Sequence, residues 1–196
     1  MTDVYTYRCQ DVMAEIIHTK NGSLIARYFI AYGTAKDRKQ IVKNLKPHLE
    51  RICRDGEAQL VLFTLLDVID DTKLLSKSLL SDLTALTPKL YMDANGRRAL
   101  LYPLIGRNKR HMTPVIVNTL KSTDSIREKT SKKDEEIRRD EVRKAVSEDM
   151  LRQVRDHADK LIVDPGGSLL VTEVLLHADG GEPFIFFNLL YRQLFY

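Results

Sequence analysis

A recurring helical unit is the feature that most limits how this chain can fold. Three breaks that contain a glycine, at Gly22, Gly56 and Gly96, each precede an apolar segment, a short polar turn and a second amphipathic segment. The glycines are spaced by 34 and 40 residues. Intervals of this length are typical of helical solenoids, in which each unit buries its apolar face only against its neighbours. The pattern therefore predicts an all-α chain folded as an α-solenoid.

The segments between the breaks have the spacing of helices. Residues 23–33 place several large apolar side chains on one broad face. Thr34 is a suitable N-cap for residues 35–45, whose apolar side chains at positions 41, 42 and 45 share one side. Residues 60–69 are apolar all round, as expected of a buried helix in a stacked array. The chain has only 9 Gly and 6 Pro, and the scarcity of these two breakers favours helices over a fold rich in turns.

The pattern divides the chain into four parts. Residues 1–120 are predicted to form about three helical repeats, and residues 113–120 are expected to supply the second helix of the third repeat. Residues 121–134 are polar without an apolar face, so we expect a linker or an exposed loop. Residues 135–181 become helical again. Residues 182–196 form an atypical apolar tail, too short to span a membrane and interrupted by Arg192.

Several classes of protein are not supported by the residues. The two cysteines, Cys9 and Cys53, lie in no CxxC or Cys/His cluster, and the five histidines are scattered. We therefore expect no disulfide framework, no metal site and a reducing compartment. The chain contains no P-loop, no GxSxG and no glycine-rich dinucleotide turn. No signal sequence and no membrane span are expected, and the prediction is a protein without a cofactor that is not an enzyme.

Charge is distributed unevenly. Residues 1–120 hold 18 Lys and Arg against 12 Asp and Glu, whereas residues 121–196 hold 13 against 15. The first part is therefore the one expected to meet a polyanion.

Three separate motifs, in this order, resemble one family. They are Gly33-Thr-Ala-Lys-Asp-Arg-Lys39, the Asp-Val-Ile-Asp-Asp-Thr-Lys-Leu stretch of residues 67–74, and Ser-Lys-Lys-Asp-Glu-Glu-Ile-Arg-Arg at 131–139. Together with Asn-Gly-Arg-Arg-Ala-Leu-Leu-Tyr-Pro-Leu at 95–104, they resemble the Puf-A/penguin branch of the Pumilio repeat superfamily. The resemblance covers about residues 12–178, corresponding to the last Puf repeats and the start of the CPL region, which would be residues 135–181. It implies a curved solenoid in the nucleus and nucleolus that binds RNA or DNA with little sequence preference during ribosome biogenesis, beside pre-rRNA and pre-ribosomal proteins. It also implies that the chain is part of a longer protein.

Pumilio-type repeats offer three side chains to each base, and this chain lacks a convincing set. The corresponding positions are Ser23, Leu24 and Arg27 in the first repeat, Ala58, Gln59 and Leu62 in the second, and Arg97, Arg98 and Leu101 in the third. Leucine cannot make a polar contact with a base edge and alanine is too short to reach one. The code of one base per repeat is therefore expected to be absent.

Cations remain as the candidate contacts. Arg27, Arg97 and Arg98 are predicted to lie on the face where a nucleic acid would run, and turn residues are predicted to hold phosphates: Lys36, Arg38, Lys39, Arg107, Lys109 and Arg110. The alternatives stay open at this point. These charges can equally be solvated helix faces, and the chain can be a protein-interaction scaffold that uses its CPL-like helices and residues 183–196.

Overall fold

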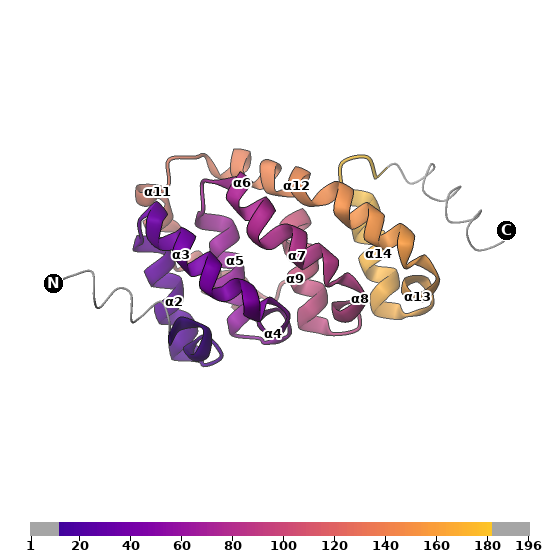
Figure 1. Cartoon of the computed structure of the whole chain (residues 1–196), viewed down its shortest axis with the longest axis horizontal. Helices are drawn as coiled ribbons and strands as arrows, with labels where there is room; N and C mark the ends of the chain where they lie inside the picture. Colours follow the sequence, from indigo (N-terminus) through magenta and orange to yellow (C-terminus); the bar gives the residue numbers. More distant parts are fainter. Residues whose placement is uncertain (1–11, 182–196) are drawn as a thin grey trace.

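The computed structural model describes residues 12–181, which form helices and connecting turns with no strand (Figure 1). Its helices are arrayed along the long axis of the molecule, although not strictly in chain order (Figure 1). They are α2 (Lys20–Tyr32), α3 (Ala35–Leu45), α4 (Leu49–Arg54), α5 (Ala58–Val68), α6 (Thr72–Leu75), α7 (Ser81–Ala85), α8 (Thr87–Leu90), α9 (Ala94–Ile105), α10 (Pro114–Lys121), α11 (Asp124–Thr130), α12 (Glu135–Asp156), α13 (Ala158–Val163) and α14 (Pro165–His177), with a 3-10 turn η1 (Lys46–His48) and a π-helical turn η2 (Ser76–Leu80).

Two rows of helices build the array. In the first row, α2, α5, α9 and α14 pack side by side in that order. In the second row, α3 is followed by the continuous run α6–η2–α7 and then by α12. Short helices such as α4, α8 and α13 lead into the first-row helices. The prediction of an all-α solenoid is confirmed.

A repeated cap begins each first-row helix. The side chains of Thr19, Asp93 and Asp164 accept hydrogen bonds from the N–H of the glycine three residues later, at 3.0, 2.7 and 2.8 Å, and Asp55 does the same for Ala58 at 2.8 Å. The glycines allow the preceding helix to come close. A Cβ at Gly22 would lie 2.0 Å from the carbonyl oxygen of Ile16, and a Cβ at Gly167 2.3 Å from that of Leu161. The turn at 164–167 therefore starts a fourth unit, which the glycine spacing had not revealed.

The third unit is interrupted by an insertion, and this corrects the predicted division of the chain. Residues 106–134, here called the strap, leave α9, return to the N-terminal end of the array and lead into α12 (Figure 1). The second helix of the third unit is α12, which packs against α7 and α9, so the prediction of residues 113–120 for that role is wrong. The prediction of a linker at 121–134 is also wrong, because the segment contains α11.

Polar anchors explain why α11 had no visible pattern. It buries only Ile126 and the side chain of Arg127, and Thr130 Oγ1 donates to the carbonyl of Ala31 at 2.8 Å. A helix held mainly by such contacts shows no apolar stripe in its sequence.

One continuous apolar core extends through the array from Met13 to Leu175. At its centre Phe63 of α5 stacks on Tyr102 of α9, with ring centroids 4.0 Å apart. No helix within residues 12–181 is long and apolar enough to cross a lipid bilayer. The predicted apolar tail, residues 182–196, lies outside the described residues.

Candidate nucleic-acid interface

The positions that contact bases in Pumilio repeats join neighbouring repeats here. Ser23 is buried and its Oγ donates to the carbonyl of Glu57 at 2.9 Å. Gln59 Nε2 donates to Asn95 Oδ1 at 3.1 Å, and Arg98 Nη1 donates to the same oxygen at 2.8 Å. The alanine and the two leucines at the remaining positions of the second and third sets are core residues. These side chains therefore link the units to one another.

The three arginines predicted on this face are also used internally. Arg27 is only 3% exposed and its Nη1 donates to the carbonyl of Thr119 at 2.7 Å. Arg97 donates to the carbonyl of Tyr91 at 2.7 Å, and Arg98 Nε to that of His111 at 3.3 Å. Burial lowers the pKa of Arg27 and of Arg98. The prediction for Arg27 must be corrected, because its side chain is buried and its Nη1 donates to a carbonyl of the chain itself. Arg97 and Arg98 are half-buried, so their contact with a nucleic acid stays a prediction.

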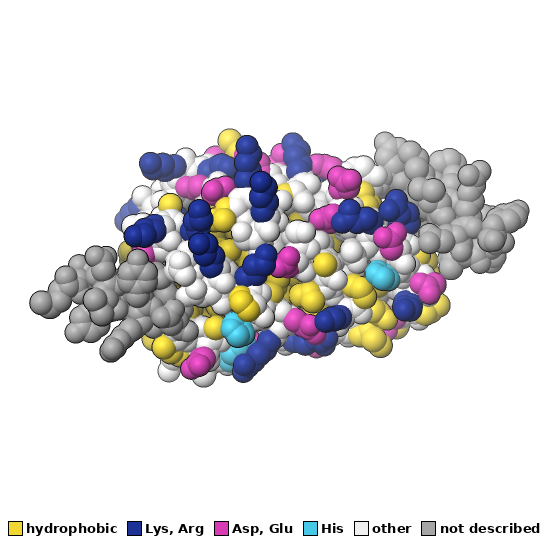
Figure 2. Space-filling view, viewed as in Figure 1, with side chains coloured by type: hydrophobic (Ala, Val, Ile, Leu, Met, Phe, Trp, Pro, Cys, Tyr) yellow, Lys and Arg dark blue, Asp and Glu magenta, His cyan; other side chains and the backbone are white. Residues whose placement is uncertain are grey.

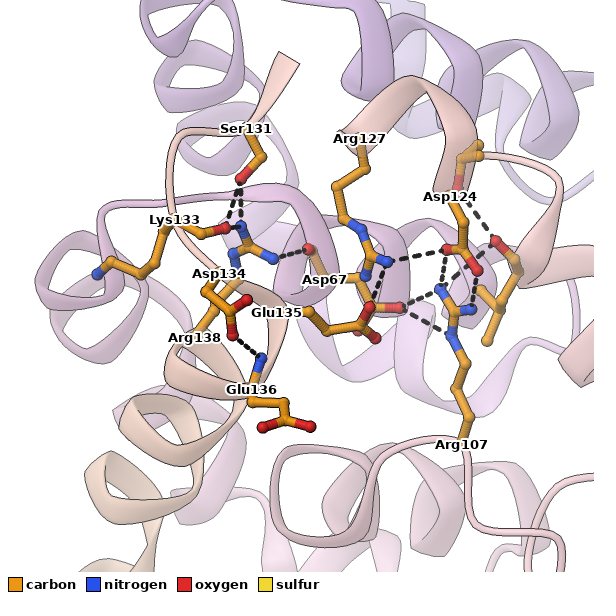
Figure 3. A network of polar contacts seen from close by, with 12 residues as sticks. Asp67, Arg107, Asp124, Arg127, Ser131, Lys133, Asp134, Glu135, Glu136 and Arg138 are labelled. Carbon is orange, nitrogen blue, oxygen red and sulfur yellow. Dashed lines mark hydrogen bonds and ion pairs between the residues drawn. The ribbon is translucent and has the colours of Figure 1, made fainter. Parts of the chain in front are cut away.

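The strap covers this face and is fixed there by a buried ion-pair network (Figure 3). Helix α10 packs on α5, and α11 packs on α2. Arg107 Nη2 lies 2.8 Å from Asp67 Oδ2, and Arg107 Nη1 lies 2.7 Å from Asp124 Oδ2. Burial alone would lower the pKa of Arg107, but the carboxylates of Asp124 and Asp67 raise it. Tyr102 also donates to Asp67, at 2.6 Å. Arg107 is thus a structural anchor and not a phosphate ligand as predicted.

Two further predicted phosphate ligands have internal partners. Arg38 is buried, and it donates to the carbonyls of Ile30 and Ala31 at 3.0 and 2.9 Å. Arg110 is more exposed but lies 3.1 Å from the buried carboxylate of Glu173. Lys36, Lys39 and Lys109 remain exposed to solvent.

Lysines gather instead on the second row of helices. A hollow of about 670 Å³ is lined by Lys36, Lys39 and Lys132, and a hollow of about 590 Å³ is lined by four other lysines, while Asp70 and Asp71 line both. Figure 2 shows dark blue side chains over this part of the molecule, around α3, α6 and the start of α12. We call this set the lysine surface: Lys36, Lys39, Lys73, Lys77, Lys132, Lys133 and Lys144.

Three acidic groups among or beside these lysines pair with basic side chains, whereas the fourth, Asp71, caps α6. Asp70 lies 2.8 Å from Arg138 and accepts a hydrogen bond from the N–H of Lys132 at 2.8 Å. Glu141 pairs with Lys133 at 2.6 Å, and Lys144 pairs with Asp140 at 2.7 Å. The five other lysines of the surface form no salt bridge with another residue of 12–181, so their ammonium groups are available to an anion.

Sequence reasoning identified Lys36 and Lys39 and missed the other five. The signals were present as Lys73 and Lys77 one helical turn apart and as the Lys132–Lys133 doublet. What was missing was the path of the strap, which brings residues 132–133 beside α3 and α6. Among the described residues there is also no cluster of His, Cys, Asp and Glu that could hold a metal ion.

Stacked units of this kind, with capped first-row helices, define a Pumilio-like helical solenoid, and comparison with known proteins identifies its branch. The model of the CPL (NUC119) domain family matches residues 92–191. The chain belongs to this family, in the Puf-A branch of the Pumilio repeat proteins. The match begins at the turn before α9 and includes the strap, so it starts well before residue 135, where the CPL region was predicted to begin.

Relatives and solved structures agree with this assignment. The chain is 33% identical to human Pumilio homolog 3 over 189 residues, which is 91% of this chain and 29% of the relative. It is 33% identical to Pumilio homology domain family member 6 of Schizosaccharomyces pombe over 170 residues, 86% of this chain and 26% of the relative. The crystal structures of human Puf-A, alone and in complex with DNA, superpose with a TM-score of 0.81 at 33% identity. The superposition covers 87% of this chain, and this chain spans about one third of the length of the human Puf-A chains.

Proposed function

We propose that this chain binds the phosphate backbone of RNA or DNA through the lysine surface, with little sequence specificity, as part of a nuclear and nucleolar protein of ribosome biogenesis. Its nucleic-acid partner would be pre-rRNA or another structured RNA, and pre-ribosomal proteins would be its neighbours. The observation that carries the proposal is the clustering of seven lysines around two adjoining hollows. The human relative whose structure holds DNA is in keeping with it.

The chemistry of the surface favours phosphates over bases. Ammonium groups contact phosphate oxygens as point charges and carry no sequence information. The linings of both hollows contain no aromatic side chain on which a base could stack. Most positions that would contact base edges are buried or bonded within the chain, and the exposed one among them, Leu24, cannot make a polar contact with a base. Binding through this surface would therefore depend on charge and strongly on salt.

Fluorescence anisotropy with an unstructured RNA and an unrelated double-stranded DNA tests the proposal at two salt concentrations. We expect similar affinity for both and a steep loss with salt, because each phosphate contact releases counterions. The double variants Lys36→Glu/Lys39→Glu and Lys73→Glu/Lys77→Glu should each weaken binding at least about tenfold and reduce the salt slope by about 1 to 2.

Arg51→Glu/Lys160→Glu is the matched control. Both residues are exposed and lie outside the two hollows, and the variant changes the net charge by the same amount. An equal loss of affinity in the control would show that only total charge matters. No binding to either nucleic acid, even at low salt, would instead favour the protein-interaction scaffold.

A further inference from the structure

A groove of about 470 Å³ lies between α10 of the strap and the first-row helices α2 and α5. Its walls include Leu24 of α2, Leu60 of α5, and Val115 and Ile116 of α10, and Lys20 and Arg27 are also among the lining side chains. It is separate from the lysine surface, with which it shares no lining residue.

The walls of the groove present apolar surface to solvent. Val115 is 73% exposed and Leu24 is 40% exposed. Helix α10 buries only Leu120 completely. Exposed aliphatic side chains that line a groove are suited to an apolar side chain of a partner.

Arg27 supplies an incompletely satisfied charge in this groove. Both of its hydrogen bonds, to the carbonyl of Thr119 and to Ser122 Oγ, come from Nη1, and its Nε is shielded from solvent without an acceptor. No carboxylate within residues 12–181 forms an ion pair with it, although Glu57 also lines the groove and acts on it electrostatically. A buried guanidinium without an anionic partner is unfavourable, so an incoming carboxylate would gain a strong, charge-assisted partner.

We propose that this groove binds a short apolar segment of a partner protein that carries one carboxylate, with the carboxylate directed to Arg27 and the apolar side chains placed between Leu24 and Val115. Nucleic acid fits the groove less well, because its lining contains no aromatic side chain for stacking. This inference does not depend on the proposed function of the lysine surface.

Selection of random 12-residue peptides displayed on phage against the full chain tests the proposal. We expect enrichment of aliphatic residues beside one Asp or Glu. A selected peptide whose acidic residue is replaced by its amide should bind about tenfold more weakly. Leu24→Asp and Val115→Asp should each weaken binding of the unmodified peptide at least about tenfold. Glu57→Gln should strengthen binding of that peptide, because a competing negative charge is removed.

Ile25→Asp is the control, since Ile25 is 61% exposed on the same helix but does not line the groove. It should leave peptide binding unchanged, and so should Lys73→Glu/Lys77→Glu. Circular dichroism and thermal melting establish that each variant is folded. The proposal would be overturned if no peptide is enriched or if the enriched peptides carry no acidic residue. It would also be overturned if Ile25→Asp weakens peptide binding as much as Leu24→Asp does. RNA binding that is lost in Leu24→Asp and Val115→Asp would assign the groove to nucleic acid.

Discussion

Asp70 connects the strap to both hollows of the lysine surface. Its carboxylate accepts hydrogen bonds from Ser131 and from the N–H of Lys132, and it pairs with Arg138, which is 1% exposed. Arg138 in turn donates to the carbonyl of Asp67 at 2.8 Å. Partial burial alone would raise the pKa of Asp70, but these donors together lower it to about 2.

The depressed pKa of Asp70 makes part of the stability dependent on pH. Because the folded value lies below the ordinary 3.8, the contribution is complete above about pH 5 and is lost as the pH falls toward 2. Asp70→Asn should lower the free energy of unfolding by about 1–2 kcal/mol at pH 7 and by progressively less below pH 4. Urea denaturation at pH 7, 4 and 3 measures this, with exposed Asp159→Asn as the control. If the difference in unfolding free energy between the wild type and Asp70→Asn stays constant with pH, the pKa of Asp70 is not depressed in the folded chain.

Cys53 is the buried thiol of α4, and burial raises its pKa to about 12. The thiolate is the reactive form, so Cys53 should be inert while the chain is folded. In a Cys9→Ser variant, we expect labelling by a thiol reagent at pH 8 to be at least about 1000-fold slower in buffer than in urea. The rate of labelling is measured by the absorbance of the coloured thiolate that the reagent releases. Rapid labelling of the folded variant would show that α4 opens readily.

At the scale of elements, the strap is held by a few polar contacts as well as by buried apolar side chains such as Met112 and Leu120. Arg107→Leu would leave the carboxylate of Asp67, which is 7% exposed, without its cation. We expect this variant to lose about 3 kcal/mol of unfolding free energy and to exchange its backbone amides in residues 114–130 faster. Chemical denaturation and hydrogen exchange measure the two effects. The control, Arg152→Leu, removes the exposed pair with Asp149 and should cost less than about 1 kcal/mol.

The same polar contacts mark the limit of prediction from sequence. The repeat, its capped helices and the family were accessible because glycine spacing and apolar periodicity are local signals. The strap was not, since α11 is held by side chains such as Thr130 whose partners are far away in the sequence. For the site, Lys36 and Lys39 could be predicted as exposed cations. Arg38 could not be excluded as a phosphate ligand, because charge alone does not distinguish an arginine in solvent from one that donates to buried carbonyls.

At the scale of the whole molecule, the strap changes how the units depend on one another. A simple solenoid has contacts only between neighbouring units and can open from one end. Here Arg27 of the first unit bonds to Thr119, and Arg38 bonds to Thr130 at 3.0 Å, so the insertion of the third unit reaches back to the first. These contacts join residues 92 positions apart in the sequence. Opening of the first unit must therefore break contacts with the insertion of the third.

We therefore expect the array to unfold as one unit in spite of its repeats. In native-state hydrogen exchange, the slowest amides of α2, α9 and α12 should share one free energy of opening with the same dependence on urea. In Arg107→Leu, the strap loses its anchor on α5, and the amides of α2 and α3 should open at a lower free energy than those of α9. Exchange of α2 and α3 at a lower free energy already in the wild-type chain would mean that the strap does not couple the first and third units. In that case stability would follow the nearest-neighbour rule of simple repeat proteins.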